Sequence, residues 1–286
     1  MIKIDLHTHS SISDGELSPW QLVKIATEKE LTTIALTDHD TIDGIDQARS
    51  AGKKFGIDII PGVEFSVNHE DGSMHLLGYY IDHHNSELIR IISKLKSSRS
   101  DRNEKIVARL NELGYNVKIG DVLRLSPEGT CGRTHIAKVL VASGKFKTVS
   151  DVFDELIGHG CPAYLDRYRL QLKDAIELIH NAGGVAVWAH PGNHGKKMDR
   201  MLDRLSLWKS YGLDGLESDY ATHSIILRDR LRKIALENGL IYTGGSDFHG
   251  SSKPDNQLGV GPEGVEISKD CLVMLQRSKQ QNSIML

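Results

Sequence analysis

The amino-acid sequence predicts an α/β barrel that carries an inserted helical segment. Through the first and last parts of the chain, short apolar runs alternate with helix-like stretches, which is the pattern of βα units around a parallel sheet. Between about residues 87 and 157 this alternation stops, and only helical periodicity remains. We therefore expect a barrel built from residues 1–86 and 158–286, and an inserted all-helical domain at residues 87–157.

The expected elements of the barrel follow from their apolar runs and their capping residues. The first helix has the clearest start, because Ser18 is a good N-cap, Pro19 suits the first helical position, and Gln21 completes a capping box. Further helices are expected at residues 43–54, 172–181, 198–211 and 224–238. Strands are expected at residues 3–9, 32–37, 57–67, 74–81, 163–165, 184–189, 213–218 and 240–244.

The helical segment differs from the rest of the chain in charge. Two apolar stripes, at residues 88–95 and 106–113, flank the polar stretch 96–102. From residue 86 to residue 150 there are 13 Lys and Arg against 6 Asp and Glu, a net charge of +7, which leaves −10 for the remainder of a chain whose net charge is −3. This contrast favours an anionic substrate over an ordinary solvated basic face.

The composition narrows the class of protein. The chain has 286 residues and a mean hydropathy of −0.30, with no apolar run long enough to span a membrane. Its first residues lack the apolar region of a signal peptide, and its three cysteines form no CxxC pair. We expect a cytoplasmic protein without a membrane partner, and no obligate protein partner is evident.

Histidines and carboxylates gather where the expected strands end. The chain has 14 histidines, and the ends of parallel barrel strands meet on one face, where active sites lie. Taken singly, each of these residues has an ordinary explanation, such as a structural His-X-His pair or a salt bridge. Burying so many ionisable groups together without metal or counter-charge would be very costly. The candidate metal ligands are His7, His9, Asp14, His39, Glu64, His75, His190, Asp247 and His249.

The types of ligand constrain the ions. Neutral imidazoles mixed with carboxylates suit Mn, Zn or Fe, and the absence of a thiolate argues against a structural zinc site. Nine ligands exceed the needs of one ion, so two or three divalent ions that share a bridging carboxylate fit better. Clustered ions lower the pKa of a bound water and hold the oxygens of an in-line displacement. That chemistry suits hydrolysis of a phosphate ester.

Several motifs resemble one known family. The chain is similar, over nearly its whole length, to the PHP (polymerase and histidinol phosphatase) domain, and the motifs occur in that family's order. The resemblance implies a distorted seven-stranded (β/α) barrel. It is carried by Asp5-Leu6-His7-Thr8-His9-Ser10, Ser13-Asp14-Gly15, Thr37-Asp38-His39-Asp40, Pro61-Gly62-Val63-Glu64, Ala189-His190-Pro191 and Gly245-Ser246-Asp247-Phe248-His249.

The resemblance also implies an assignment of ligands to three metal sites, with Mn as the expected ion and Zn or Fe as alternatives. A hydroxide that bridges two ions would attack phosphorus, so no side-chain nucleophile is needed. Asp38, which we include among the catalytic candidates, and Asp40 would orient imidazoles. The first site would comprise His7, His9, Glu64 and Asp247; the second Glu64, His75 and His190; and the third Asp14, His39 and His249.

One branch of the family matches the helical segment. Gly132-Arg133-Thr134-His135-Ile136-Ala137 resembles a motif of members that have a helical insertion, although Thr134 stands where the branch often has Pro. Those members are nucleoside 3′,5′-bisphosphate phosphatases or 5′→3′ exoribonucleases acting on short RNA. The resemblance implies that Arg133 and His135 are catalytic, with His135 binding a phosphate or protonating a leaving oxygen. The candidate substrate-binding residues are Arg99, Arg102, Arg133, His135 and His223, and the expected partner is a nucleotide or a short 5′-phosphorylated RNA.

Three other functions remain as alternatives. A phosphatase of a small monoester such as histidinol phosphate is disfavoured by the basic helical segment. An amidohydrolase also opens with His-X-His, but those enzymes commonly use a modified Lys where this chain has Glu64. A non-catalytic metal-containing nucleic-acid module is disfavoured by the net charge of −3. The sequence leaves open the metal, the general acid, the oligomeric state, and the choice between a free bisphosphate and an RNA end.

Overall fold

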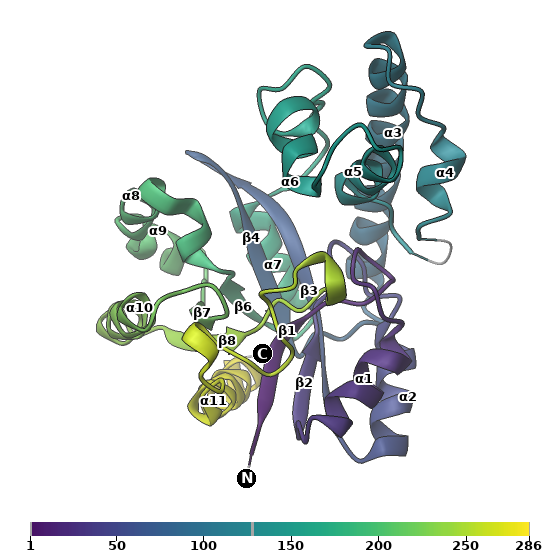
Figure 1. The fold of residues 1–286 in the computed structure, drawn as a ribbon. Helices are drawn as coiled ribbons and strands as arrows, with labels where there is room; N and C mark the ends of the chain where they lie inside the picture. The colour runs from purple at the N-terminus through teal and green to yellow at the C-terminus, as the bar shows by residue number, and fades with distance from the viewer. Residues whose placement is uncertain (1, 127–128, 286) are drawn as a thin grey trace.

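The computed structural model describes residues 2–126 and 129–285, and its centre is a curved sheet surrounded by helices (Figure 1). Seven strands follow one another in the order β1-β2-β3-β4-β6-β7-β8, and the short β5 pairs with β3 outside this path. The strands are β1 (Ile4–Thr8), β2 (Thr33–Leu36), β3 (Asp58–His69), β4 (Gly72–Tyr79), β5 (Leu170–Gln171), β6 (Val185–Trp188), β7 (Gly215–Tyr220) and β8 (Ile241–Gly245).

The chain after β8, the last strand in this order, lies beside β1, the first. Immediately after β8, the amide of Asp247 donates to the carbonyl of His7 at 2.8 Å, and the amide of His9 donates to the carbonyl of Phe248 at 3.0 Å. These bonds bring the sheet close to closure at the end where β1 finishes. The predicted distorted seven-stranded barrel is therefore confirmed.

Strand β4 departs from the parallel arrangement that the alternation of strands and helices predicted. It pairs antiparallel with β3 on one side and with β6 on the other. The reason is the connection, because only residues 70 and 71 lie between β3 and β4, and parallel strands need a crossover of a dozen residues or more. The Asp71-Gly72 dipeptide is a hairpin signal that the sequence did contain.

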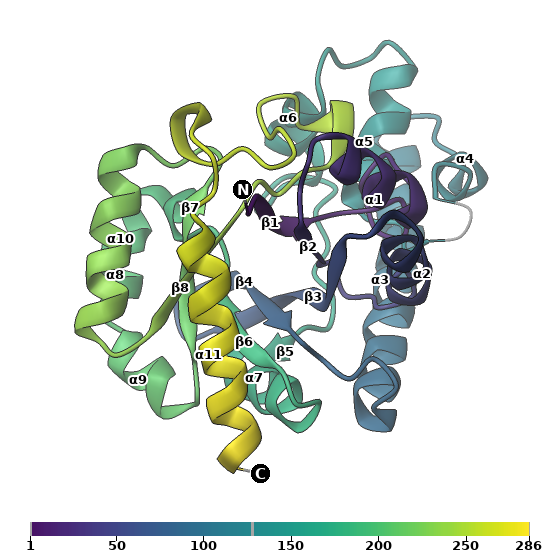
Figure 2. The same ribbon diagram turned by 90° about the horizontal axis from the view of Figure 1, so that it is seen from below.

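Helices pack around the outside of the barrel and across one of its ends (Figure 2). The capping box predicted at Ser18 is present, with the Ser18 side chain accepting from the Gln21 amide. The last helix was not predicted, and its residues Cys271 and Leu275 pack with apolar side chains of β1, β4 and β6. No helix among the described residues combines the length and apolar character of a membrane span. The helices are α1 (Pro19–Glu28), α2 (Ile45–Phe55), α7 (Leu172–Asn181), α8 (Met198–Leu202), α9 (Leu205–Ser210), α10 (Ile225–Glu237) and α11 (Lys269–Met285).

Two expected elements differ from the structure. Residues 163–165 form no strand, because Ala163 and Leu165 pack into the apolar cluster of the inserted helices instead. The strand that pairs with β3 comes five residues later, as β5. The single helix expected at residues 198–211 is two short helices, α8 and α9, separated at residues 203 and 204.

The inserted segment is helical, as expected, but it is not separate from the barrel. Its first helix, α3 (Ser86–Glu112), runs without a break through the polar stretch 96–102. The first half of α3 packs into the barrel's apolar cluster through Leu88 and Leu95, whereas the second half packs into a separate cluster through Ile106 and Leu110. That second cluster is completed by α4 (Ile119–Leu123), α5 (Arg133–Ala142), α6 (Val149–Val152) and the π-helix η1 (Phe153–Ile157).

Candidate metal centre

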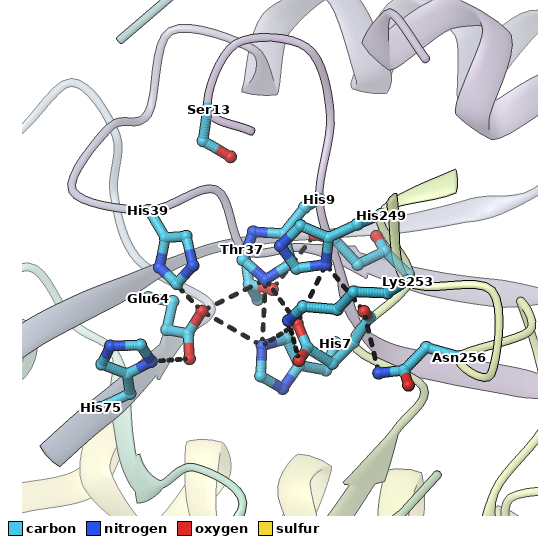
Figure 3. A network of polar contacts seen from close by, with 12 residues as sticks. His7, His9, Ser13, Thr37, His39, Glu64, His75, His249, Lys253 and Asn256 are labelled. Carbon is cyan, nitrogen blue, oxygen red and sulfur yellow. Dashed lines mark hydrogen bonds and ion pairs between the residues drawn. The ribbon is translucent and has the colours of Figure 1, made fainter. Parts of the chain in front are cut away.

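All nine candidate ligands lie together at the end of the barrel that faces the inserted helices. The potential ligand atoms of eight of them fall into three overlapping groups, within each of which the atoms lie no more than 4.8 Å apart. The ninth, His190, joins the cluster through its Nε2, which lies 3.0 Å from Oε1 of Glu64. Figure 3 shows how His7, His9, His39, His75 and His249 surround Glu64. The groups are His7, His9, Glu64 and Asp247; His9, Asp14, His39 and His249; and His39, Glu64 and His75.

The barrel strands place most of these side chains by ending beside one another. His7 belongs to β1 and His9 follows it, His39 follows β2, His190 follows β6, and Asp247 follows β8. The backbones of His190 and Asp247 have positive φ angles of 31° and 55°. Such angles are strained for residues other than Gly and concentrate at functional sites. The strain aims both side chains inward, since each is buried.

His75 reaches the same centre by a different route. It lies near the beginning of β4, opposite Ser66 of β3. Because β4 runs antiparallel, its beginning lies at the same end of the barrel as the carboxyl ends of the parallel strands. The expectation that His75 joins the cluster agrees with the structure, but the reason given for it, a parallel strand end, was wrong.

Glu64 lies at the middle of the cluster with its two oxygens turned to different imidazoles. Oε1 lies 2.8 Å from Nδ1 of His75 and 3.0 Å from Nε2 of His190. Oε2 lies 3.2 Å from Nε2 of His9 and 3.0 Å from Nδ1 of His39. Burial would raise the pKa of Glu64, but the surrounding imidazoles hold that pKa well below its usual range. The carboxylate is therefore charged and positioned to bridge two groups of ligands.

Asp247 and Asp14 extend the cluster on its other side. Oδ1 of Asp247 lies 3.2 Å from Nε2 of His9, while Oδ2 accepts from the Tyr220 hydroxyl at 2.9 Å and from Nζ of Lys253 at 2.6 Å. Oδ1 of Asp14 lies 3.1 Å from Nε2 of His249. Each carboxylate thus presents one oxygen to the imidazoles, as a monodentate metal ligand would.

Several atoms of the cluster are buried without a hydrogen-bond partner, which tests whether a metal fits. Oδ1 of Asp14, Oε2 of Glu64, Nδ1 of His39 and Nε2 of His249 are all in this state. Nε2 of His7 and Nε2 of His9 also face each other at 3.1 Å. Buried polar atoms are normally satisfied, so lone pairs that converge without bonding one another are the arrangement that a bound cation would satisfy. The side chains fit divalent metal ions.

The orientation of His7 depends on a residue that the sequence did not single out. Oε1 of Glu217 lies 3.0 Å from Nδ1 of His7, and Oε2 accepts from the backbone amide of His190 at 2.8 Å. A carboxylate on the far nitrogen fixes the tautomer of a ligating imidazole and raises its basicity. Glu217 was visible only as a carboxylate within the strand expected at residues 213–218, where it does not end the strand.

Asp38 and Asp40 do not orient imidazoles, which corrects their expected role. The carboxylate of Asp38 accepts from the amide and hydroxyl of Ser10 and from the hydroxyl of Ser13, at 2.6–2.7 Å. It therefore fixes the loop that leads to Asp14. The carboxylate of Asp40 accepts from Arg99 and from Arg167. Burial would raise the pKa of Asp40, but the two guanidinium groups hold that pKa well below its usual range.

A cavity lies beside the cluster, between the barrel and the inserted helices. Its walls include Asp14, His39 and His75 together with five arginines. Arg102 is buried, and burial together with the charges of the neighbouring arginines lowers its pKa to about 8. Two of the five come from the irregular segment after η1 and were not predicted. The arginines are Arg99, Arg102, Arg133, Arg167 and Arg169.

The two other histidine candidates, His135 and His223, are buried. His135 is buried, its Nδ1 accepts from the amide of Gly132 at 3.0 Å, and it does not line the cavity. Both ring nitrogens of His223 bond to backbone, because Nδ1 donates to the carbonyl of Ser218 and Nε2 accepts from the amide of Gly192. These bonds fix the ring of His223, and its expected role in substrate binding stays a prediction. His194 lies in a short 3₁₀ helix beside Trp188.

Comparison with known proteins agrees with this geometry. The family model described as PHP domain matches residues 5–162. The chain is 35% identical over 247 residues to a 5′-3′ exoribonuclease of Haemophilus influenzae, covering 86% of this chain and 90% of the relative. It is 34% identical over 266 residues to a 3′,5′-nucleoside bisphosphate phosphatase of Chromobacterium violaceum, covering 91% of each. A crystal structure from Bifidobacterium adolescentis, proposed to be a metal-dependent phosphoesterase, superposes with a TM-score of 0.87 at 31% identity and covers 97% of this chain and 96% of that one.

Proposed function

The chain belongs to the PHP domain family, and on that premise we propose that this phosphoesterase hydrolyses nucleotide phosphate esters. The substrates we propose are nucleoside 3′,5′-bisphosphates, which would release the 3′-phosphate, and the 5′ end of short RNA. The observation that carries the proposal is the arginine-lined cavity beside the imidazole and carboxylate cluster. A substrate with two phosphate groups can place one at each.

We assign the nine clustered residues as ligands of two or three divalent ions, with Mn as the first candidate and Zn or Fe as alternatives. Glu64 supports more than one ion, because its two oxygens face different imidazoles. Such ions supply an activated water and neutralise charge on a phosphate group. The protein's own part is to orient the ligands, which Glu217 does for His7.

The inserted segment, residues 87–157, is in this proposal the substrate-binding domain. It supplies Arg99 and Arg102 from α3 and Arg133 from the first turn of α5. Guanidinium groups can bind phosphate oxygens in pairs and remain charged at neutral pH. They would hold the phosphate that is not cleaved and thereby fix the distance between the scissile ester and the metal ligands.

A substrate panel on metal-loaded protein tests the proposal. We expect adenosine 3′,5′-bisphosphate and 5′-phosphorylated RNA oligomers to be hydrolysed much faster than AMP, which has only one phosphate, and faster than histidinol phosphate. Release of phosphate and of mononucleotides would be measured separately, so that the two nucleotide substrates are distinguished. Equal rates on AMP or histidinol phosphate would overturn the assignment of the arginine cavity.

A further inference from the structure

A second group of potential metal ligands lies apart from the barrel's cluster. Asp46, His83 and His84 each offer one ligand atom, and these atoms lie within 4.8 Å of one another. Asp46 is in the first turn of α2, and the two histidines are in the turn that joins β4 to α3. None of the three lines the arginine cavity, so the proposed phosphoesterase reaction gives them no role.

The backbone that carries the two histidines is fixed on several sides. The amide of Asp82 donates to the carbonyl of Ala182 at 2.7 Å, and the amide of His84 donates to Oδ1 of Asp82 at 3.0 Å. Asn85 then caps α3 by accepting from the Leu88 amide at 3.0 Å. A turn held in this way presents its side chains in a constant position, so ligand binding would cost little backbone ordering.

The three side chains already converge. Nε2 of His83 lies 2.9 Å from Oδ1 of Asp46, and the rings of His83 and His84 lie 4.1 Å apart between centroids. An ion pair between His83 and Asp46 would account for the first contact but not for the second. The second contact places two imidazole rings side by side, where a nitrogen of each can donate a lone pair to one cation.

The set of donors selects a class of ion. Two imidazole nitrogens and one carboxylate oxygen suit Zn²⁺ and similar first-row dications, which bind such atoms at about 2.0–2.2 Å. His83 is buried and contacts Asp46, while Asp46 and His84 are exposed to solvent. Water would complete the coordination from the solvent side.

We propose that Asp46, His83 and His84 form a peripheral site for a transition-metal dication such as Zn²⁺. The bound ion ties the first turn of α2 to the turn before α3. It joins, from outside, two elements that border the catalytic cluster, since α2 follows the loop of His39 and α3 carries Arg99. The site is independent of the proposed substrate and of the number of ions in the catalytic cluster.

The test counts Zn²⁺ per chain in the intact protein. Wild type, Asp46→Ala and His84→Ala would be dialysed against the same micromolar Zn²⁺ and analysed by mass spectrometry of the metal. We expect each variant to bind one Zn²⁺ fewer than wild type and to keep its phosphoesterase activity, because neither residue belongs to the catalytic cluster. Both side chains are exposed, so folding should not be affected.

His159→Ala is the matched control, because His159 is also exposed but belongs to none of the groups of potential ligands. It should bind as much Zn²⁺ as wild type does. Thermal melting gives a second measurement: Zn²⁺ added to wild type whose catalytic cluster is already filled should raise the melting temperature, and the same addition to His84→Ala should not. Wild-type stoichiometry in both variants would overturn the proposal, and so would an equal loss in the His159→Ala control.

Discussion

Arg102 carries a charge that the folded protein itself does not balance. Its side chain is 4% exposed, its Nε donates to Oδ1 of Asn103 at 3.2 Å, and among the described residues it pairs with no carboxylate. Burial and four neighbouring arginines lower its pKa to about 8. A buried, unpaired positive charge that destabilises the free protein is typical of a site that binds an anionic substrate.

We therefore expect Arg102→Met to separate stability from binding. The melting temperature should stay the same or rise, because repulsion among the arginines falls. KM for adenosine 3′,5′-bisphosphate should rise about tenfold or more, because the substrate loses one charge-assisted hydrogen bond. Steady-state kinetics and thermal melts check this. Arg109→Met, an exposed change on the same helix, should alter neither quantity. A lower melting temperature with unchanged KM would show that Arg102 is structural.

A substitution at Glu217 tests whether the orientation of the His7 imidazole affects the metal affinity of the whole cluster. Glu217→Gln keeps the shape of the side chain but removes the charge beside Nδ1 of His7. Loss of such a partner typically weakens metal binding by about 10- to 100-fold. Competition with a chromophoric chelator measures the affinity, and Glu237→Gln, exposed on α10, is the control. Wild-type affinity in Glu217→Gln would mean that the other ligands alone fix His7.

At the scale of whole elements, the sequence predicted what is periodic and missed what is irregular. Apolar runs located the seven main strands, and the nine clustered side chains were singled out because they lie within those runs or in the loops that follow them. The direction of β4 was not predicted, because repeating βα units imply parallel strands, whereas a two-residue connection makes β4 antiparallel to β3. Arg167 and Arg169 lie in a segment without repeating structure, so no period links them to the cavity. Glu217 was missed because only the curvature of the barrel brings it to His7.

Asp40 connects three parts of the fold, so its replacement should destabilise the packing of all three. Buried after β2, it accepts from Arg99 of α3, from Arg167 of the segment after η1 at 2.5 Å, and from the amide of Ser66 in β3 at 3.1 Å. Asn tolerates the φ of 52° found here, so Asp40→Asn removes charge without straining the backbone. It should lower the free energy of unfolding by about 3–5 kcal/mol, because two buried guanidinium groups lose their counter-charge.

Urea denaturation measures that change, and a neighbouring ion pair supplies the comparison. Asp43 pairs with Lys96 of α3, but its side chain is 51% exposed. Exposed pairs contribute at most about 1 kcal/mol, so Asp43→Asn should have a small effect. Similar losses in the two variants would contradict the view that the buried ion pairs of Asp40 contribute more to stability than the exposed pair of Asp43.

At the scale of the molecule, the metal ligands and the fold should depend on each other. The cluster joins side chains from both ends of the chain, from His7 to His249, and leaves buried carboxylate and imidazole atoms unsatisfied. Removal of metal by a chelator should lower the melting temperature, and refilling should restore it. An ion present at 100 times its dissociation constant adds about 2.7 kcal/mol of stability. Equal melting temperatures for chelated and refilled protein would contradict this, whatever the activity.

Because α3 belongs to two apolar clusters, the inserted segment cannot be removed without disrupting the core of the barrel. Cutting the chain at residues 87 and 157 would remove Leu88, Ile92 and Leu95 from the barrel's own core. A trimmed barrel that still folds would have to keep α3 up to about residue 96 and rejoin the chain beyond it. The same continuity affects any transfer of this insertion to another barrel. The receiving enzyme would gain the substrate specificity of the insertion only if the first half of α3, which packs in the barrel, were transferred as well.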